Sequence, residues 1–156
     1  CWFEILKRNK PSGILLSRQN LPVLPTNTAG VSKGAYAVKE VSNPKVAIIA
    51  TGSEVSVALK TAEKLESEGI STQVVSAPCL EWLSEQDESY RQSLLPKNSL
   101  KVSIEAGIAQ GWREYVGDNG LIISIDHFGA SASAGKLFEE FGFTAEKISA
   151  KIKAAL

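Results

Sequence analysis

The chain has 156 residues, of which 44% are hydrophobic and 22% are charged, which is enough for one ordinary domain with a hydrophobic core. Its 17 basic and 17 acidic residues balance, so the composition gives no electrostatic attraction to nucleic acid or to an anionic membrane. Because no apolar run approaches the roughly 20 residues that span a bilayer and no secretory signal is visible, we expect a cytoplasmic protein with neither nucleic acid nor membrane as a partner.

The first twenty residues contain one short helix and one short strand. A helix is expected over residues 2–8, a turn over residues 10–13 and a strand over residues 14–16. Arg18 follows that strand in the run SRQNLP (residues 17–22), and its planar guanidinium fits a carboxylate or a phosphate. An anionic ligand is one interpretation of Arg18. A surface ion pair, or a hydrogen-bonded corner between two domains, is the other.

Residues 21–35 have the composition of a linker that runs over a surface. The residues typical of turns and linkers there are Pro22, Pro25, Asn27, Thr28 and Gly30. Because one helix and one strand cannot bury a core, we place a domain boundary in this linker. The main domain is then expected over residues 36–156.

Five short apolar runs rich in valine and isoleucine follow the linker, at residues 36–38, 46–50, 72–77, 101–105 and 121–125. Strands of this kind are usually covered on both faces, as in a parallel sheet. Helices are expected from Ser53 to before Gly69, from Ser84 to before Pro96, over residues 112–116, around residues 137–138, and from Thr144 to the C-terminus. The pattern predicts an α/β fold with three layers, α/β/α, and a mostly parallel five-stranded sheet.

In open α/β sheets, ligands bind beyond the carboxyl ends of the strands, where this chain has several polar residues and glycines. The turn TGSE (residues 51–54) can bind an anion through backbone N–H groups at the start of a helix. The same residues are explained without a ligand if Ser53 is the N-cap and Glu54 lies in the first helical turn. The single glycine favours this structural interpretation.

Glu105, Asp126 and His127 also follow predicted strands. One histidine and two carboxylates can perform acid and base catalysis if they converge on one reacting atom. Each residue has a structural alternative, because Glu105 and Asp126 can cap the turns that follow, and His127 can be a polar surface residue. Residue type alone favours the structural alternative.

Small residues dominate the run FGASASAG (residues 128–135), which predicts a tight loop before the next helix. Phe141 and Phe143 are expected to pack at the end of that helix. If this aromatic surface faced outward, it would instead mark a subunit interface.

Cysteine and methionine content gives two further expectations. Cys1 and Cys79 lie far apart and, with His127 as the single histidine, form no metal-ligand spacing, so we expect reduced thiols and no metal site. The chain contains no methionine and thus no initiator residue. We therefore expect it to be a piece of a longer protein.

A series of short motifs, in order along nearly the whole chain, resembles the C-terminal third of transketolase. These motifs are SRQNLP (17–22), KGAYAV (33–38), IIATGSEV (48–55), LESEGI (65–70), VVSAP (74–78), YRQSLLP (90–96), SIEAG (103–107), GWREYVG (111–117) and IDHFGAS (125–131). By this resemblance, residues 1–20 end the pyrimidine-binding domain, residues 21–35 are a linker, and residues 36–156 form the transketolase C-terminal domain.

The resemblance implies a homodimeric parent enzyme that uses thiamine diphosphate with Mg²⁺ or another divalent cation. Such an enzyme reversibly transfers a two-carbon ketol group from xylulose 5-phosphate to ribose 5-phosphate or erythrose 4-phosphate. The cofactor motif, the catalytic glutamate and the active-site histidines of the family belong to earlier domains. We therefore expect this piece to contain no catalytic residue, to bind no cofactor or metal, and to be inactive alone, while it supplies a scaffold and dimer contacts.

Arg18 matches the arginine of the family's SRQ motif, which contacts the phosphate of the sugar substrate. A charge-assisted bidentate contact suits a phosphate dianion and orients the reacting carbon far from it. The chain departs from the family at His127, because many members have an arginine at that place in the IDxFGAS run. Any role inferred for that position is therefore a structural or interface role.

Related C-terminal domains occur in 1-deoxyxylulose-5-phosphate synthase and in the β part of 2-oxo-acid dehydrogenases, which are the alternative enzyme classes. SRQNLP and IATGSEV resemble transketolase more closely. A folded module without catalytic activity, acting in assembly or regulation, is the alternative from a different functional class.

Overall fold

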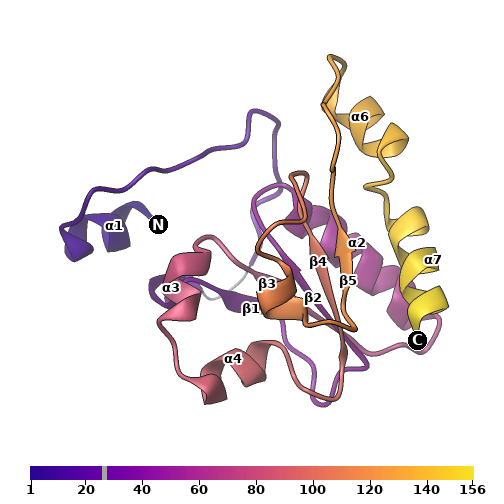
Figure 1. Ribbon diagram of the computed structural model, residues 1–156, viewed down its shortest axis with the longest axis horizontal. Coiled ribbons are helices and arrows are strands. Elements are labelled where there is room, and N and C mark those ends of the chain that lie inside the picture. The colour runs from indigo at the N-terminus through magenta and orange to yellow at the C-terminus, as the bar shows by residue number, and fades with distance from the viewer. Residues whose placement is uncertain (26–27) are drawn as a thin grey trace.

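The computed structural model describes residues 1–25 and 28–156, so Asn27, on which part of the linker prediction rests, lies outside the described residues. The strands are β1 (Tyr36–Lys39), β2 (Val46–Ala50), β3 (Thr72–Ser76), β4 (Leu100–Ile104) and β5 (Leu121–Ile123). They form one sheet in the order β1-β3-β2-β4-β5, in which only β1 pairs in the antiparallel sense. The predicted five-stranded, mostly parallel α/β sheet is confirmed (Figure 1).

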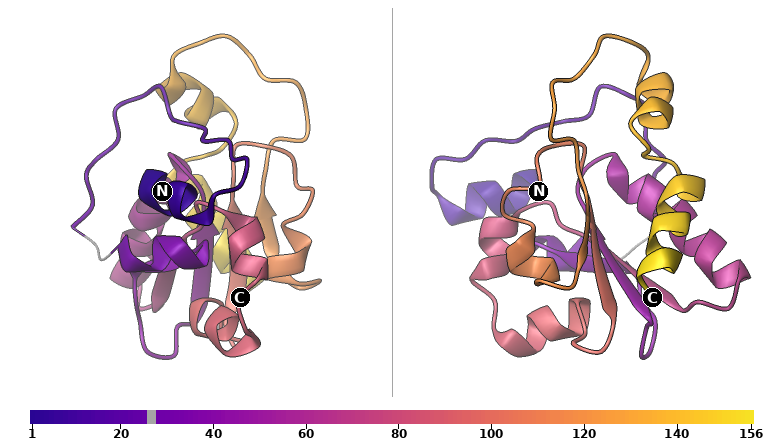
Figure 2. Two further views of the ribbon diagram at one scale, coloured as in Figure 1. Left: turned by 90° about the vertical axis from the view of Figure 1, so that its left-hand side faces the viewer. Right: turned by 45° about the vertical axis from the view of Figure 1, so that its right-hand side comes forward.

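Helices cover both faces of the sheet and make the three predicted layers (Figure 2). One face is covered by α2 (Glu54–Ser67), α6 (Ala134–Glu140) and α7 (Ala145–Ala155), and the other by α3 (Leu80–Ser84), α4 (Glu88–Leu94) and α5 (Arg113–Val116). Successive strand residues point to opposite faces. Ile48 therefore packs in the core beneath α2 and α7, while Ile49 packs in the core beneath α3 and α5.

The helix predicted from Ser84 to before Pro96 is α4 (Glu88–Leu94), so its predicted start was wrong, because Ser84 belongs to the preceding helix α3. Ser84 ends α3, and Asp87 is the N-cap of α4. The Asp87 carboxylate accepts a hydrogen bond from the backbone N–H of Tyr90 at 2.7 Å. This bond satisfies one of the free N–H groups of the new helix, and it places the helix start three residues later than the sequence pattern indicated.

The N-terminal helix forms as predicted, but the strand predicted over residues 14–16 does not. Helix α1 (Trp2–Arg8) is followed by an irregular arc that leads back over the sheet (Figure 1). Leu15 in this arc is 95% exposed. A strand needs the backbone hydrogen bonds of a neighbouring strand, and none of the five described strands pairs with this segment.

The linker region contains a short 3₁₀ helix, η1 (Thr28–Lys33), which the sequence pattern did not indicate. The Arg8 side chain joins α1 to η1 and α3. It pairs with Glu85 at 2.8 Å, donates to the carbonyl oxygen of Ser32 at 3.3 Å, and lies 4.1 Å from the ring centroid of Trp82. The guanidinium thus holds α1 against the main domain through ionic, hydrogen-bonding and cation–π contacts.

The C-terminal aromatic residues divide between the core and the surface. Phe143 is buried, and its ring lies 5.8 Å from that of Phe138. Phe141 is half-buried, whereas Phe128 in the loop before α6 is fully exposed. Core packing at the helix end is therefore confirmed for Phe143. Among the described residues, no helix has the length and apolar character needed to cross a membrane.

Gly34 offers a direct test of the packing between β1 and α3. Its φ is +88°, and a Cβ atom there would lie 2.3 Å from the backbone nitrogen of Leu83 and 2.4 Å from the carbonyl oxygen of Cys79. We expect Gly34→Ala to lower the free energy of unfolding by about 2–4 kcal/mol, because both the backbone angle and the space exclude a methyl group. Urea unfolding of the chain measures this change.

Gly135 is the matched control, because it lies in α6 and a Cβ atom there would meet nothing within 4 Å. Gly135→Ala should raise the free energy of unfolding by about 0.5–1 kcal/mol through helix propensity. If Gly34→Ala is as stable as Gly135→Ala, the described packing at Gly34 is wrong.

Candidate functional site at the strand ends

The carboxyl ends of β2 and β4 lie where the direction of chain winding reverses. After β2, the chain passes through α2 to β3 on one side of β2, and then through α3 and α4 to β4 on the other side. The connections on the two sides of β2 therefore leave in opposite directions. This switch point is the place where open α/β sheets bind ligands.

Two carboxylates meet at this switch point. The Thr51 hydroxyl, just after β2, donates a hydrogen bond to Glu105, just after β4. Glu54, the first residue of α2, is only 5% exposed, and the Ser53 hydroxyl donates to its Oε1 at 3.0 Å. The site thus has an acidic pair, the buried Glu54 and the half-buried Glu105, with one hydroxyl donor for each member.

Burial gives the acidic pair unusual protonation behaviour. The pKa of Glu105 is raised to about 7, mainly by burial and also by the negative charge of Glu54. Burial likewise raises the pKa of Glu54, against the opposing effects of its own backbone N–H and the Ser53 hydroxyl. Near neutral pH, Glu105 is therefore partly protonated, and the two carboxyl groups do not both carry a full negative charge.

Ser53 occupies the N-cap position of α2, as the interpretation of this turn without a ligand predicts. Its side chain, however, makes no capping hydrogen bond to the helix backbone. The hydroxyl donates to Glu54 instead of accepting a bond from the helix backbone. Because the Glu54 carboxylate lies at the turn, the electrostatics of residues 51–54 oppose an anionic ligand. The structure favours the interpretation of this turn without an anion.

Asp126 and His127 do not join Glu105 in a catalytic cluster. Asp126 accepts hydrogen bonds from the backbone N–H of Ala109 at 2.9 Å and from the Ser124 hydroxyl at 2.6 Å. The Ser124 hydroxyl, then the Ala109 N–H, and then the nearby His127 hold the pKa of Asp126 below its usual value. Asp126 therefore ties together the loops that follow β4 and β5.

His127 packs against an aromatic residue. Its ring centroid lies 4.9 Å from that of Phe141, with an edge-to-face arrangement, and its Nδ1 lies 2.8 Å from the carbonyl oxygen of Phe128. Among the described residues, neither Asp126 nor His127 forms a hydrogen bond or ion pair with Glu105. The geometry supports the structural alternative for both residues.

Arg18 is exposed and has no hydrogen-bond or ion-pair partner within the described part of the chain. Its neighbour Ser17 nevertheless lies over the end of β2. A Cβ atom on Gly52 would be 3.8 Å from Ser17 Oγ and 3.9 Å from Glu54 Oε2. The segment that carries Arg18 and the acidic pair therefore approach the same turn.

Sequence reasoning missed Thr51 and Glu54 as members of this site. Both lie directly after a buried strand, in the turn that was considered only as an anion site or a helix start. The available signal was that acidic residues follow two apolar runs, at Glu54 and at Glu105. This pattern indicates a shared site only when the order of the strands is known, because only adjacent parallel strands bring their carboxyl ends together.

The described residues do not fit a thiamine diphosphate or its metal ion. No group of three or more histidine, cysteine, aspartate or glutamate side chains in residues 1–25 and 28–156 is placed to hold a metal ion. The acidic pair at the switch point would repel a diphosphate. We therefore assign no cofactor chemistry to this part of the molecule.

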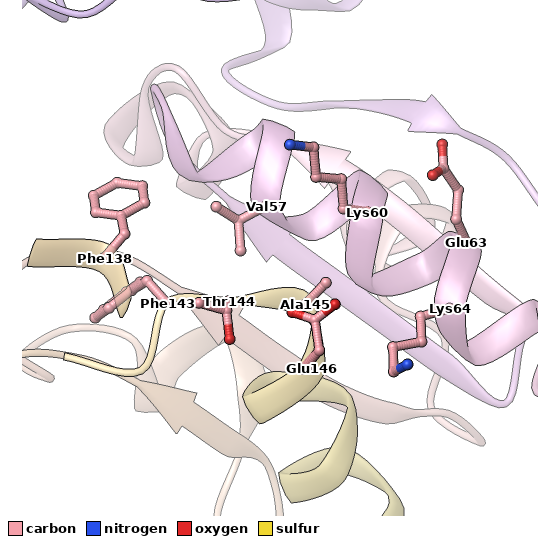
Figure 3. A pocket seen from close by; sticks show the side chains of 9 residues that line it. All are labelled: Val57, Lys60, Glu63, Lys64, Phe138, Phe143, Thr144, Ala145 and Glu146. Atoms are coloured by element: carbon pink, nitrogen blue, oxygen red, sulfur yellow. The ribbon is translucent and has the colours of Figure 1, made fainter. Parts of the chain in front are cut away.

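A groove lies away from the strand ends, between α2 and the start of α7, with a volume of about 750 Å³ (Figure 3). Its walls carry charges of both signs, with Lys60 and Lys64 opposed by Glu63 and Glu146. The Thr144 hydroxyl accepts from the backbone N–H of Lys147 and so caps its own helix. These features describe a solvated helix junction and give no preference for one ligand.

Comparisons with known proteins assign the domain to a family. A three-layer α/β domain with a polar switch point is common to many nucleotide- and cofactor-dependent enzymes. The model of the transketolase-like C-terminal domain matches residues 34–144, and the chain belongs to this family.

The matching proteins are transketolases, and the chain spans about a quarter of their length or less. It is 44% identical to a transketolase from Mycobacterium leprae over 99% of the chain and 24% of that protein. It is 48% identical to the chloroplastic transketolase of Solanum tuberosum over 96% of the chain and 21% of that protein. A Pichia stipitis transketolase structure in complex with sedoheptulose 7-phosphate superposes with a TM-score of 0.82 at 34% identity, covering 88% of this chain and 20% of that one.

The raised pKa of Glu105 predicts a pH-dependent stability. The unfolded carboxyl titrates near 4.5 and the folded one near 7, so the unfolded state releases its proton first as the pH rises. The contribution of Glu105 to stability is therefore present below about pH 4.5 and is lost as the pH rises to about 7. The loss is on the order of 1–3 kcal/mol in the free energy of unfolding.

Glu105→Gln should remove this part of the pH dependence, because the amide does not titrate. Urea unfolding at pH 5 and pH 8 measures the effect, with Glu114→Gln on the exposed face of α5 as the control. The prediction fails if Glu105→Gln loses as much stability between the two pH values as the unsubstituted protein.

Proposed function

We propose that this chain is the C-terminal part of a transketolase, whose whole enzyme reversibly transfers a two-carbon ketol group between sugar phosphates. The observation that carries the proposal is the 44% identity to a transketolase over 99% of the chain, which includes the SRQNLP segment. The fold supports the same conclusion through its similarity to solved transketolases. The donors and acceptors we propose are xylulose 5-phosphate and ribose 5-phosphate or erythrose 4-phosphate.

In the proposed enzyme, residues 1–20 end the pyrimidine-binding domain, residues 21–35 are the linker, and residues 36–156 are the C-terminal domain. Exposed apolar side chains on the N-terminal segment support this division, because a neighbouring domain would cover them. They are Trp2, Phe3, Leu6, Ile14, Leu15, Leu16, Leu21 and Val23. The Arg8 contacts with Glu85 and Ser32 then lie at the junction of the two domains.

The remaining parts of the active site belong to the other domains of the proposed enzyme. Those domains hold thiamine diphosphate and a divalent cation such as Mg²⁺, and the enzyme is a homodimer to which this domain contributes contacts. The cytoplasmic location stays a prediction, since the relatives include chloroplastic transketolases.

Within this chain, Arg18 is the residue that we propose to bind substrate, through the phosphate of the sugar. Its exposure and its lack of a described partner leave all five N–H donors available. Related transketolase structures from Pichia stipitis are described as complexes with xylulose 5-phosphate, fructose 6-phosphate and sedoheptulose 7-phosphate. A guanidinium that binds the shared phosphate would serve each of these sugars.

Replacement of Arg18 tests this role in the full-length enzyme. Arg18→Ala should lower kcat/KM for a phosphorylated ketose donor about a hundredfold, which corresponds to a loss of about 2–3 kcal/mol for a charge-assisted contact. The value for a donor without the phosphate should change little. Steady-state kinetics with the two donors measures the difference.

Arg113→Ala is the control, because Arg113 is an exposed arginine whose described partner is Asp118 on the surface. It should leave kcat/KM for both donors unchanged. An equal loss with both donors in Arg18→Ala would rule out the phosphate role.

A second candidate function is a folded module that acts in assembly or regulation without catalysis. It is favoured by two hydrophobic core clusters whose buried members all lie within residues 35–152. Isothermal titration of the 156-residue chain with thiamine diphosphate and Mg²⁺ should give no stoichiometric binding under either function. Tight binding would contradict the assignment of the cofactor site to other domains.

A further inference from the structure

The turn between α5 and β5 contains an asparagine followed directly by a glycine, at Asn119 and Gly120. Asn119 is exposed, and its side chain makes no hydrogen bond within the described part of the chain. The turn comes just before β5, so it lies at the amino ends of the parallel strands, away from the acidic pair at their carboxyl ends. The side-chain amide of Asn119 is therefore open to water and is not held by a partner.

Packing requires a glycine at position 120. A Cβ atom there would lie 2.4 Å from the carbonyl oxygen of Val116 and 2.5 Å from its Cβ atom. Val116 is itself buried in the core at the end of α5. A larger residue after Asn119 would therefore disturb this helix. Glycine is also the residue that least obstructs a reaction of its own backbone nitrogen, because it has no Cβ atom.

The other asparagines of the chain do not precede a glycine. Asn43 is followed by proline, whose nitrogen carries no hydrogen, and each of the others is followed by a residue with a Cβ atom. These others are Asn9, Asn20, Asn27 and Asn98. Asn98 is exposed like Asn119, so it is the natural internal reference for the reactivity of Asn119.

We propose that Asn119 is a site of spontaneous deamidation, with Gly120 as the attacking residue. The backbone nitrogen of Gly120 loses its proton and bonds to Cγ of Asn119, while the bond from Cγ to the side-chain nitrogen breaks and ammonia leaves. Water then opens the resulting ring. Breakage of the new bond to Cγ gives aspartate, and breakage of the bond to the main-chain carbonyl carbon gives isoaspartate. Water is consumed and ammonia is released, with no oxidation or reduction.

The backbone of the turn permits the rotation that ring closure needs. The Gly120 N–H donates to the carbonyl oxygen of Gly117 at 3.4 Å, which is long for a hydrogen bond, so the attacking nitrogen is weakly held. Gly117, at the start of the turn, has a φ of +77°. An exposed turn with a glycine on each side of Asn119 is a segment in which local opening costs little free energy.

The two products differ in what they do to the fold. Both add a negative charge beside Asp118, whose partner is Arg113 at 3.1 Å. Isoaspartate also adds a main-chain atom directly before β5, where Leu121 is in register with Val102 of β4. The isoaspartate form should therefore unfold at a lower urea concentration than the aspartate form.

The test incubates the folded 156-residue chain at mildly alkaline pH and follows each asparagine-containing peptide by mass spectrometry. The Asn119 peptide should exchange NH for O at least about tenfold faster than the Asn98 peptide, since a Cβ atom on the attacking residue hinders ring closure. The rate should increase with pH, because the attacking nitrogen must lose its proton. Chromatography should separate two products of equal mass, aspartate and isoaspartate.

Two glutamine variants provide matched controls. Asn119→Gln should abolish the mass change in its peptide, because the longer side chain has to close a larger ring. Asn98→Gln should leave the rate at Asn119 unchanged. Asn119→Asp supplies the aspartate product directly, so its urea unfolding can be compared with that of the isolated isoaspartate form.

The rates at Asn119 and Asn98 decide the proposal. Equal rates at the two positions, or reaction at Asn98 with Asn119 intact, would overturn it. An Asn119 that reacts in urea but stays intact in the folded chain would overturn it as well, because the turn would then protect the asparagine. Fast conversion at Asn119 in the folded chain, absent in Asn119→Gln, is the result we expect.

Discussion

The strand order β1-β3-β2-β4-β5 is the constraint on which the site depends. It puts β2 in the centre of the sheet, with parallel neighbours on both sides, so the turn after β2 is at the switch point. The same order brings the end of β4 beside that turn and allows Thr51 to reach Glu105. The burial of Glu54 and the partial burial of Glu105 oppose folding as the pH rises, and such an electrostatic cost is more typical of functional sites than of packing.

The N-terminal segment depends on polar contacts and has little apolar packing of its own. Arg8 links α1 to α3 and η1, while Trp2, Phe3 and Leu6 on the same helix are exposed. An exposed ion pair contributes little stability, so this contact is weaker than the two cores that hold the helices on the sheet. Helix α1 is therefore held to the main domain chiefly by the polar and cation–π contacts of Arg8.

The strands of the sheet could be predicted because each one is marked by apolar residues within a short stretch of sequence. The candidate site could not be predicted, because its residues come from separate stretches that only the strand order brings together. Residues 46–50 are a continuous apolar run, and their burial on both faces follows from composition alone, while β3 is marked by Val74 and Val75 at its centre. The predicted strand at residues 14–16 has a similar composition, but it lacks a neighbour to complete its hydrogen bonds. The helix start at Asp87 was missed because Ser84 offers an equally good capping residue three positions earlier. Proximity of Glu54 and Glu105 required the order of strands, which composition does not contain.

The different outcomes for Glu105 and Asp126 show how local hydrogen bonds decide the role of a strand-end acid. Asp126 is exposed and receives bonds from Ser124 and Ala109, so its charge is stabilised and its function is to join two loops. Glu105 is half-buried beside Glu54 and receives a hydroxyl, so its charge is opposed. Only the second arrangement leaves a carboxyl group whose charged form is destabilised near neutral pH, which is a property more typical of functional sites than of loop anchors.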